Sequence, residues 1–327
     1  MKLARFFIEN PGVRYIMYGG KGGLGKTTFS AATAFYLARR GHKVLIFSVD
    51  PQASLSDIFA RKIFGQGEVE IMPNLYALEV DADRRIKAYG DEIRKRILDM
   101  YGFEKVPEEI DDYIKAASAE PAMEESAIFD EVVEIITKGG YDYYIYDLVP
   151  LGHALYYLSM SSVYDAWINK IAALRQEMQK YDRVIATVQR KKETSEDKIL
   201  AELLYIKERI NTSSRILTDP EMTAFFFVLT PEEMTILDTA KACSLFSKFN
   251  VPIRGFIVNR VIPRNLIREN IPQYLKHRIE MQESLLTEIN QQFGEKVLGY
   301  VPELDRDVRG LDMIERMAEE MFGDNNG

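Results

Sequence analysis

The chain has 327 residues, of which 46% are hydrophobic and 28% are charged, and it carries a formal net charge of −8. This composition is typical of a soluble globular protein, and the length suffices for one large α/β domain or two small ones. The acidic balance argues against a nucleic-acid partner. A single cysteine, Cys243, excludes an internal disulfide framework.

The N-terminal segment 1–10 is short and charged, unlike a secretory signal. The chain also lacks a run of 18 or more apolar residues, which a transmembrane helix would need. We therefore expect a cytoplasmic protein. Any membrane role would then work through a membrane receptor or a cargo.

The first predicted strand, 14–18, leads into a glycine-rich loop that opens an alanine-rich predicted helix over 29–38. The loop fits the P-loop pattern G-x-x-x-x-G-K-[ST] at every fixed position. Glycines let backbone N–H groups approach a phosphate chain, and the helix N-terminus favours the same anion. The predicted ATP-binding residues of this loop are Gly20, Lys21, Gly22, Gly23, Leu24, Gly25, Lys26, Thr27 and Thr28.

Two lysines of the loop differ in what they predict. Lys26 is the ordinary P-loop lysine, expected to contact the terminal phosphates, and the hydroxyl of Thr27 is expected to bind Mg²⁺ directly. Lys21 lies among the glycines, where most P-loops carry no charge.

Further short apolar runs read as buried parallel strands separated by helical patterns, which indicates βαβ units. They span 44–49, 75–80, 143–146, 224–229, 253–258 and 297–301. The predicted fold is α/β, with the doubly wound, mostly parallel sheet of a P-loop NTPase. The residues Asp50, Asp147, Asn259 and Pro302 follow or end such strands, where a ligand crevice is expected.

Two helical stretches, about 83–128 and 153–219, are too long to be simple crossovers. We predict a single P-loop ATPase domain over 1–327, with a helical subdomain formed by these insertions. The second stretch carries one-sided apolar stripes. The stripes either pack within the protein or form an apolar groove for a helix of another chain.

Two motifs beyond the P-loop make the pattern specific. They are Asp50-Pro51-Gln52-Ala53-Ser54-Leu55-Ser56-Asp57 and Asp147-Leu148-Val149-Pro150-Leu151-Gly152-His153. Together with Lys21, they resemble the two switches of the family of the arsenite-pump ATPase and the ATPase that targets tail-anchored membrane proteins. This family has a deviant Walker A motif, and the resemblance covers nearly the whole chain.

The resemblance implies a role for each site residue. Lys21 would cross a homodimer interface to the partner's nucleotide, and Lys21, Lys26 and Asp57 would be the catalytic residues, with Asp57 acting on the attacking water. Asp147 and Asp50 would support Mg²⁺ through its other ligands. In addition, Asn259 would recognise the adenine edge, and the backbone around Pro302 would close over the ring. As alternatives, Asp57 could be a helix cap, and Asp50 could serve only a strand-end turn.

The chain departs from the family in its cysteines. The zinc-binding CxxC pair of eukaryotic targeting ATPases would fall near Pro272 and Leu275, so no zinc is expected. Cys243 alone cannot supply the several cysteines with which arsenite-pump enzymes bind the metalloid.

Three functions compete. The leading hypothesis is a homodimeric Mg-ATPase whose nucleotide state controls a helical subdomain that binds hydrophobic segments of client proteins, as in tail-anchored targeting. The alternative is an ATPase subunit that energises an anion or metalloid transporter. A partitioning or positioning ATPase comes third, because the C-terminal segment 313–321 is acidic rather than basic.

Overall fold

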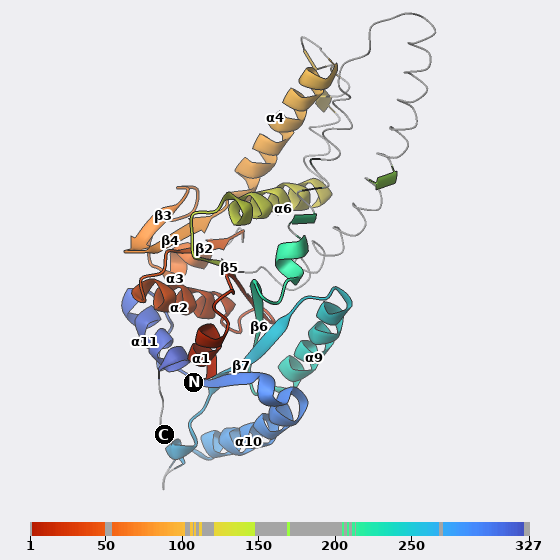
Figure 1. The fold of residues 1–327 in the computed structure, drawn as a ribbon. Helices are drawn as coiled ribbons and strands as arrows, with labels where there is room; N and C mark the ends of the chain where they lie inside the picture. Colours follow the sequence, from red (N-terminus) through yellow and green to blue (C-terminus); the bar gives the residue numbers. More distant parts are fainter. Residues whose placement is uncertain are drawn as a thin grey trace, which may run out of the picture. The chain divides into compact units, whose positions relative to one another are not determined.

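The computed structural model of the chain describes residues 2–49, 54–101, 105–106, 108, 111–112, 121–147, 169–170, 205, 208, 211–212, 214–267 and 271–323. One eight-stranded sheet has the order β3-β4-β2-β5-β1-β6-β7-β8 (Figure 1). All neighbouring strands pair in parallel except β3 and β4. The predicted α/β fold with a doubly wound, mostly parallel sheet is confirmed.

Except for β3, the strands agree with the predicted apolar runs to within a few residues. Their bounds are β1 Tyr15–Gly19, β2 Val44–Ser48, β3 Val69–Met72, β4 Leu75–Glu79, β5 Tyr143–Asp147, β6 Thr223–Leu229, β7 Ile253–Val261 and β8 Val297–Pro302. The described helices are α1 Lys2–Glu9, α2 Lys26–Arg39, α3 Ser54–Ile58, α4 Ala82–Tyr101, α6 Pro121–Lys138, α9 Glu233–Lys248, α10 Gln273–Phe293 and α11 Leu311–Phe322, with short 3₁₀ turns at Arg264–Leu266 and Gly294–Lys296.

Both faces of the sheet are covered, as the continuous apolar strands require. On one face Phe226 of β6 packs against Phe6 of α1, with ring centroids 5.1 Å apart, in a core shared with α2 and α11. Its neighbours Phe225 and Phe227 turn to the other face and contact Phe246 of α9, at 4.5 and 5.3 Å. The central strand β6 is thereby covered by helices on both faces.

The edge strand β3 was missed from the sequence. It pairs antiparallel with β4 through the two-residue turn Pro73-Asn74, in which Asn74 adopts a φ of 70°. A short polar side chain tolerates this left-handed conformation better than most. Because Glu70 interrupts the apolar pattern of a four-residue strand, no periodic signal marked it.

The chain divides into two compact units. The first comprises Met1–Asp81, Gly139–Leu155 and Leu217–Gly327, and the second comprises Ala82–Lys138 and Tyr156–Ile216. In the second unit α4 contacts α6, and Arg85 pairs with Glu92 of its own helix at 2.7 Å and with Glu131 of α6 at 2.8 Å.

The predicted helical subdomain is only partly visible in the described residues. Helices α4 and α6 occupy much of the predicted insertion at 83–128. Most of the stretch 153–219, with its apolar stripes, lies outside the described residues. The subdomain and its groove therefore stay predictions. Within the described parts of the chain, no helix is long and apolar enough to cross a membrane.

Candidate functional site

The P-loop joins the end of β1 to the start of α2, as the sequence predicts. Gly20 has a φ of 146°, and a Cβ there would lie 2.5 Å from the carbonyl oxygen of Val228. Gly25 precedes α2 with a left-handed φ of 100°. Only glycine fits both conditions without strain. Within the loop, the Nζ atom of Lys26 donates to the carbonyl oxygen of Lys21 at 3.3 Å.

Three hydroxyl groups converge on the carboxylate of Asp147, at the end of β5. Thr27 donates to Oδ2 at 2.7 Å, Ser30 donates to Oδ1 at 3.3 Å, and Ser54 donates to Oδ2 at 3.4 Å. Thr27 and Ser30 lie one turn apart on α2, whereas Ser54 begins α3. Asp147 thus connects the P-loop helix to the segment that carries Asp57.

Asp147 is 3% exposed, and burial raises its pKa from 3.8 to about 6, while the hydrogen bond from Thr27 and the charge of Lys26 act in the opposite direction. Burial disfavours the charged carboxylate, so a nearby cation would stabilise it. Hydroxyl and carboxylate oxygens are ligands suited to Mg²⁺. The residues around Asp147 therefore fit a magnesium ion that accompanies a phosphate chain.

Helix α3 carries Asp57, whose side chain is exposed, and is tied to β4 by Glu79. The Oε1 atom of Glu79 accepts from the backbone N–H groups of Leu55 at 2.6 Å and Ser56 at 3.0 Å, and Oε2 accepts from the Ser56 hydroxyl. Sequence reasoning missed Glu79. A carboxylate closing the apolar strand Leu-Tyr-Ala-Leu-Glu was the available signal.

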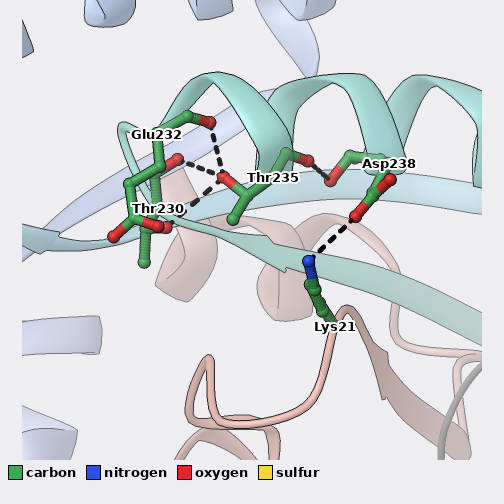
Figure 2. A network of polar contacts seen from close by, with 6 residues as sticks. Lys21, Thr230, Glu232, Thr235 and Asp238 are labelled. Carbon is green, nitrogen blue, oxygen red and sulfur yellow. Dashed lines mark hydrogen bonds and ion pairs between the residues drawn. The ribbon is translucent and has the colours of Figure 1, made fainter.

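Lys21 is held by a residue that the sequence did not suggest. Its Nζ atom lies 3.4 Å from Oδ2 of Asp238 on α9, with both side chains partly exposed. Figure 2 shows Lys21 reaching from the P-loop to this helix. The start of α9 is fixed by Thr235, whose hydroxyl contacts the carbonyl oxygens of Thr230 and Glu232 at 2.6 and 2.9 Å (Figure 2).

The end of β7 also contacts the P-loop. Asn259 donates from Nδ2 to the carbonyl oxygen of Leu24 at 2.8 Å, and Arg260 donates to that of Gly23 at 2.9 Å. Arg260 adopts a left-handed φ of 55°. Pro302 ends β8 opposite Val261 in the register of the sheet. These contacts support the loop, while recognition of adenine by Asn259 and Pro302 stays a prediction.

The structure thus brings together most of the predicted site residues. Direct hydrogen bonds join the P-loop segment to Asp147 and to Asn259. Asp57 lies one helical turn after Ser54, whose hydroxyl is bonded to Asp147. Asp50 and residues 148–153 of the second motif lie outside the described residues. The catalytic and metal-binding roles of these residues stay predictions.

Comparison with known proteins gives a match over almost the whole chain. The profile of a family described as anion-transporting ATPases matches residues 13–323. A relative in Aquifex aeolicus (strain VF5), provisionally named arsenical pump-driving ATPase 1, is 30% identical over 95% of this chain and 79% of its own length.

Other relatives carry different names. The ATPase GET3C of Arabidopsis thaliana is 28% identical over 94% of this chain and 81% of its own length. The ATPase ASNA1 homolog 2 of Paramecium tetraurelia is 26% identical over 95% of this chain and 94% of its own length. These names agree with the resemblance that the two switch motifs indicated.

Proposed function

The chain belongs to the anion-transporting ATPase family and is an ATP hydrolase, and we propose that it acts as a cytoplasmic, Mg²⁺-dependent homodimer whose nucleotide state controls client binding. The clients would be tail-anchored proteins or other hydrophobic membrane-protein segments. Relatives named as arsenical pump and GET3 ATPases support the hydrolase, and the position of Lys21 supports the dimer.

The residues around the P-loop suggest how hydrolysis would proceed. The loop amides and Lys26 would hold the phosphates of ATP, and the hydroxyl of Thr27, backed by Asp147, would bind Mg²⁺, which neutralises phosphate charge. Asp57 would orient the attacking water. Phosphoryl transfer needs such positioning and charge neutralisation more than covalent help.

The observation that carries the proposed dimer is the outward direction of the Lys21 side chain. A lysine that served its own phosphates would be expected to point into the loop, as Lys26 does. Lys21 instead turns outward to Asp238 (Figure 2). Because this ion pair is partly exposed, Lys21 could leave Asp238 and reach a second copy of the chain. Sedimentation with Mg²⁺ and a non-hydrolysable ATP analogue should give a dimer, and a strictly monomeric protein under these conditions would contradict the proposal.

Client binding is tested by co-expression with a membrane protein that has one C-terminal apolar helix. The ATPase should co-purify with this helix and keep it in solution. A matched client whose helix carries two central charged residues is the control. Equal capture of both helices, or of neither, would contradict the proposed client class.

The second candidate is an ATPase that energises an anion transporter, which the family description and the name of the Aquifex relative favour. Metalloid binding in one protomer would rest on Cys243 alone among the cysteines. Hydrolysis stimulated by arsenite or antimonite would favour this function over client targeting.

A further inference from the structure

Glu79 is a buried carboxylate at the catalytic edge of the sheet. Glu79 is 1% exposed and lies at the carboxyl end of β4. In the register of the sheet it lies opposite Ser48 of β2, which in turn lies opposite Asp147 of β5. Glu79 therefore shares the edge at which the phosphate site is built, two strands away from Asp147.

The side-chain hydrogen bonds that the structure describes for Glu79 go to α3. One carboxylate oxygen accepts two backbone N–H groups at the start of the helix, from Leu55 and Ser56, and the other accepts the hydroxyl of Ser56. A carboxylate is expensive to bury unless its oxygens are hydrogen-bonded, and here both are. The start of α3 is consequently attached to strand β4 of the sheet.

Ser56 also connects the start of α3 to the loop that follows this helix. Its oxygen also accepts the backbone N–H groups of Ile63 and Phe64, each at 3.1 Å. The chain before and after Asp57 is therefore held by one hydroxyl, which Glu79 orients. Asp57 is the next residue after Ser56, and it projects an exposed side chain from this fixed backbone.

We propose that Glu79 is a positioning residue for ATP hydrolysis, which anchors α3 through Ser56 so that Asp57 is held in place for the attacking water. This inference rests on the proposed role of Asp57. Displacement of a catalytic group by about 1 Å can cost about 100-fold in rate, so an anchor of this kind controls turnover without contacting ATP.

The test compares kcat with nucleotide affinity in purified, folded protein. Glu79→Ala should lower kcat by about 10- to 100-fold, while the Kd of a fluorescent ATP analogue changes by less than about 3-fold. Glu79→Gln keeps one acceptor oxygen for the two backbone N–H groups, so its kcat should lie between those of Glu79→Ala and the unmodified chain. Glu70→Gln, exposed on the adjacent strand β3, is the control for loss of one negative charge.

A purely structural role of Glu79 is distinguished by repeating the Glu79→Ala change in a chain that also carries Asp57→Asn. The rate of ATP hydrolysis is measured there in single turnovers. If Glu79 acts through Asp57, Glu79→Ala should cause no further loss of rate in that background. An equal loss in both backgrounds would overturn the proposal, as would an unchanged kcat in Glu79→Ala.

Two further outcomes are distinguishable. If Glu79→Ala does not fold, Ser56→Ala removes only the hydroxyl bridge and is judged by the same criteria. If Asp57→Asn alone hydrolyses ATP at the unmodified rate, the proposed role of Asp57 is wrong, and the role of Glu79 falls with it. The Asp57→Asn variant alone therefore tests the role of Asp57 separately from the role of Glu79.

Discussion

The glycines of the P-loop differ in how much space surrounds them. A Cβ at Gly20 would meet the carbonyl oxygen of Val228 at 2.5 Å in a backbone conformation that disfavours other residues, whereas a Cβ at Gly22 would meet nothing within 4 Å. We predict that Gly20→Ala lowers the free energy of unfolding by about 2 to 4 kcal/mol. Urea denaturation of the nucleotide-free protein measures this.

Gly22→Ala is the matched control, and it should change the free energy of unfolding by less than about 0.5 kcal/mol. Equal stability of the two variants would mean that the loop does not pack against β6 as the structure describes.

The thiol of Cys243 provides a pH-dependent test. Burial raises its pKa to about 11, against a smaller opposing effect of Lys296. A raised pKa lowers the thiolate fraction at neutral pH, so alkylation by iodoacetamide at about pH 7.5 should be about 100-fold slower than for an ordinary cysteine. The rate should still rise roughly tenfold per pH unit between about pH 8 and 9.5.

Because Cys243 is the single cysteine, mass spectrometry follows one modification. The urea-unfolded chain is the control and should react at the ordinary rate. Fast alkylation of the folded protein would mean that a thiolate is present at neutral pH, which would strengthen the metalloid alternative.

Single residues were predictable from the sequence where a motif fixes them. Thr27 and Asp147, 120 residues apart, were both expected at the phosphate site, and their side chains are hydrogen-bonded. Asp238 and Glu79 were not expected, because their contacts with Lys21 and α3 arise only when separate strands and helices assemble.

Helix α9 is the element that restrains Lys21, through Asp238. If Lys21 must leave Asp238 to reach a partner's nucleotide, this ion pair opposes dimerisation. We predict that Asp238→Asn tightens the ATP-dependent dimer by about 2- to 30-fold, because each dimer releases two such pairs and a partly exposed ion pair contributes about 0.2 to 1 kcal/mol. Sedimentation equilibrium with a non-hydrolysable ATP analogue measures the dimer Kd of Asp238→Asn and of the unmodified chain.

Glu233→Gln removes one exposed acidic charge from the same helix and should leave the dimer Kd unchanged. A weaker dimer in Asp238→Asn would show that Asp238 supports the dimer rather than opposing it.

Strands with a continuous apolar run were predictable from the sequence, whereas short or mixed elements were not. Strand β6 has every residue buried, and it was recognised from its continuous apolar run. Strand β3 lies at the edge, with a mixed sequence, and was missed. Helix α3 has only five residues, too few for periodicity, so its position depends on Glu79 and Asp147 rather than on its own pattern.

The proposed site is divided between two protomers. Asp57 would serve the nucleotide bound in its own chain, whereas Lys21 would serve the nucleotide of the partner. A change at either residue should therefore inactivate the homodimer. In each site, Asp57 would come from the chain that binds the nucleotide and Lys21 from its partner. Variants at the two positions can therefore distinguish action across the interface from action within one protomer.

Mixing two inactive variants tests this division. In a heterodimer of Lys21→Ala and Asp57→Asn, the nucleotide bound to the Lys21→Ala chain keeps its own Asp57 and receives Lys21 from the other protomer. Random pairing at equal concentrations should restore about one quarter of the unmodified specific activity. If Lys21 acts within its own chain, neither site of the heterodimer is complete and the mixture stays inactive. Each variant alone, at the same total concentration, is the control, and steady-state phosphate release is the measurement.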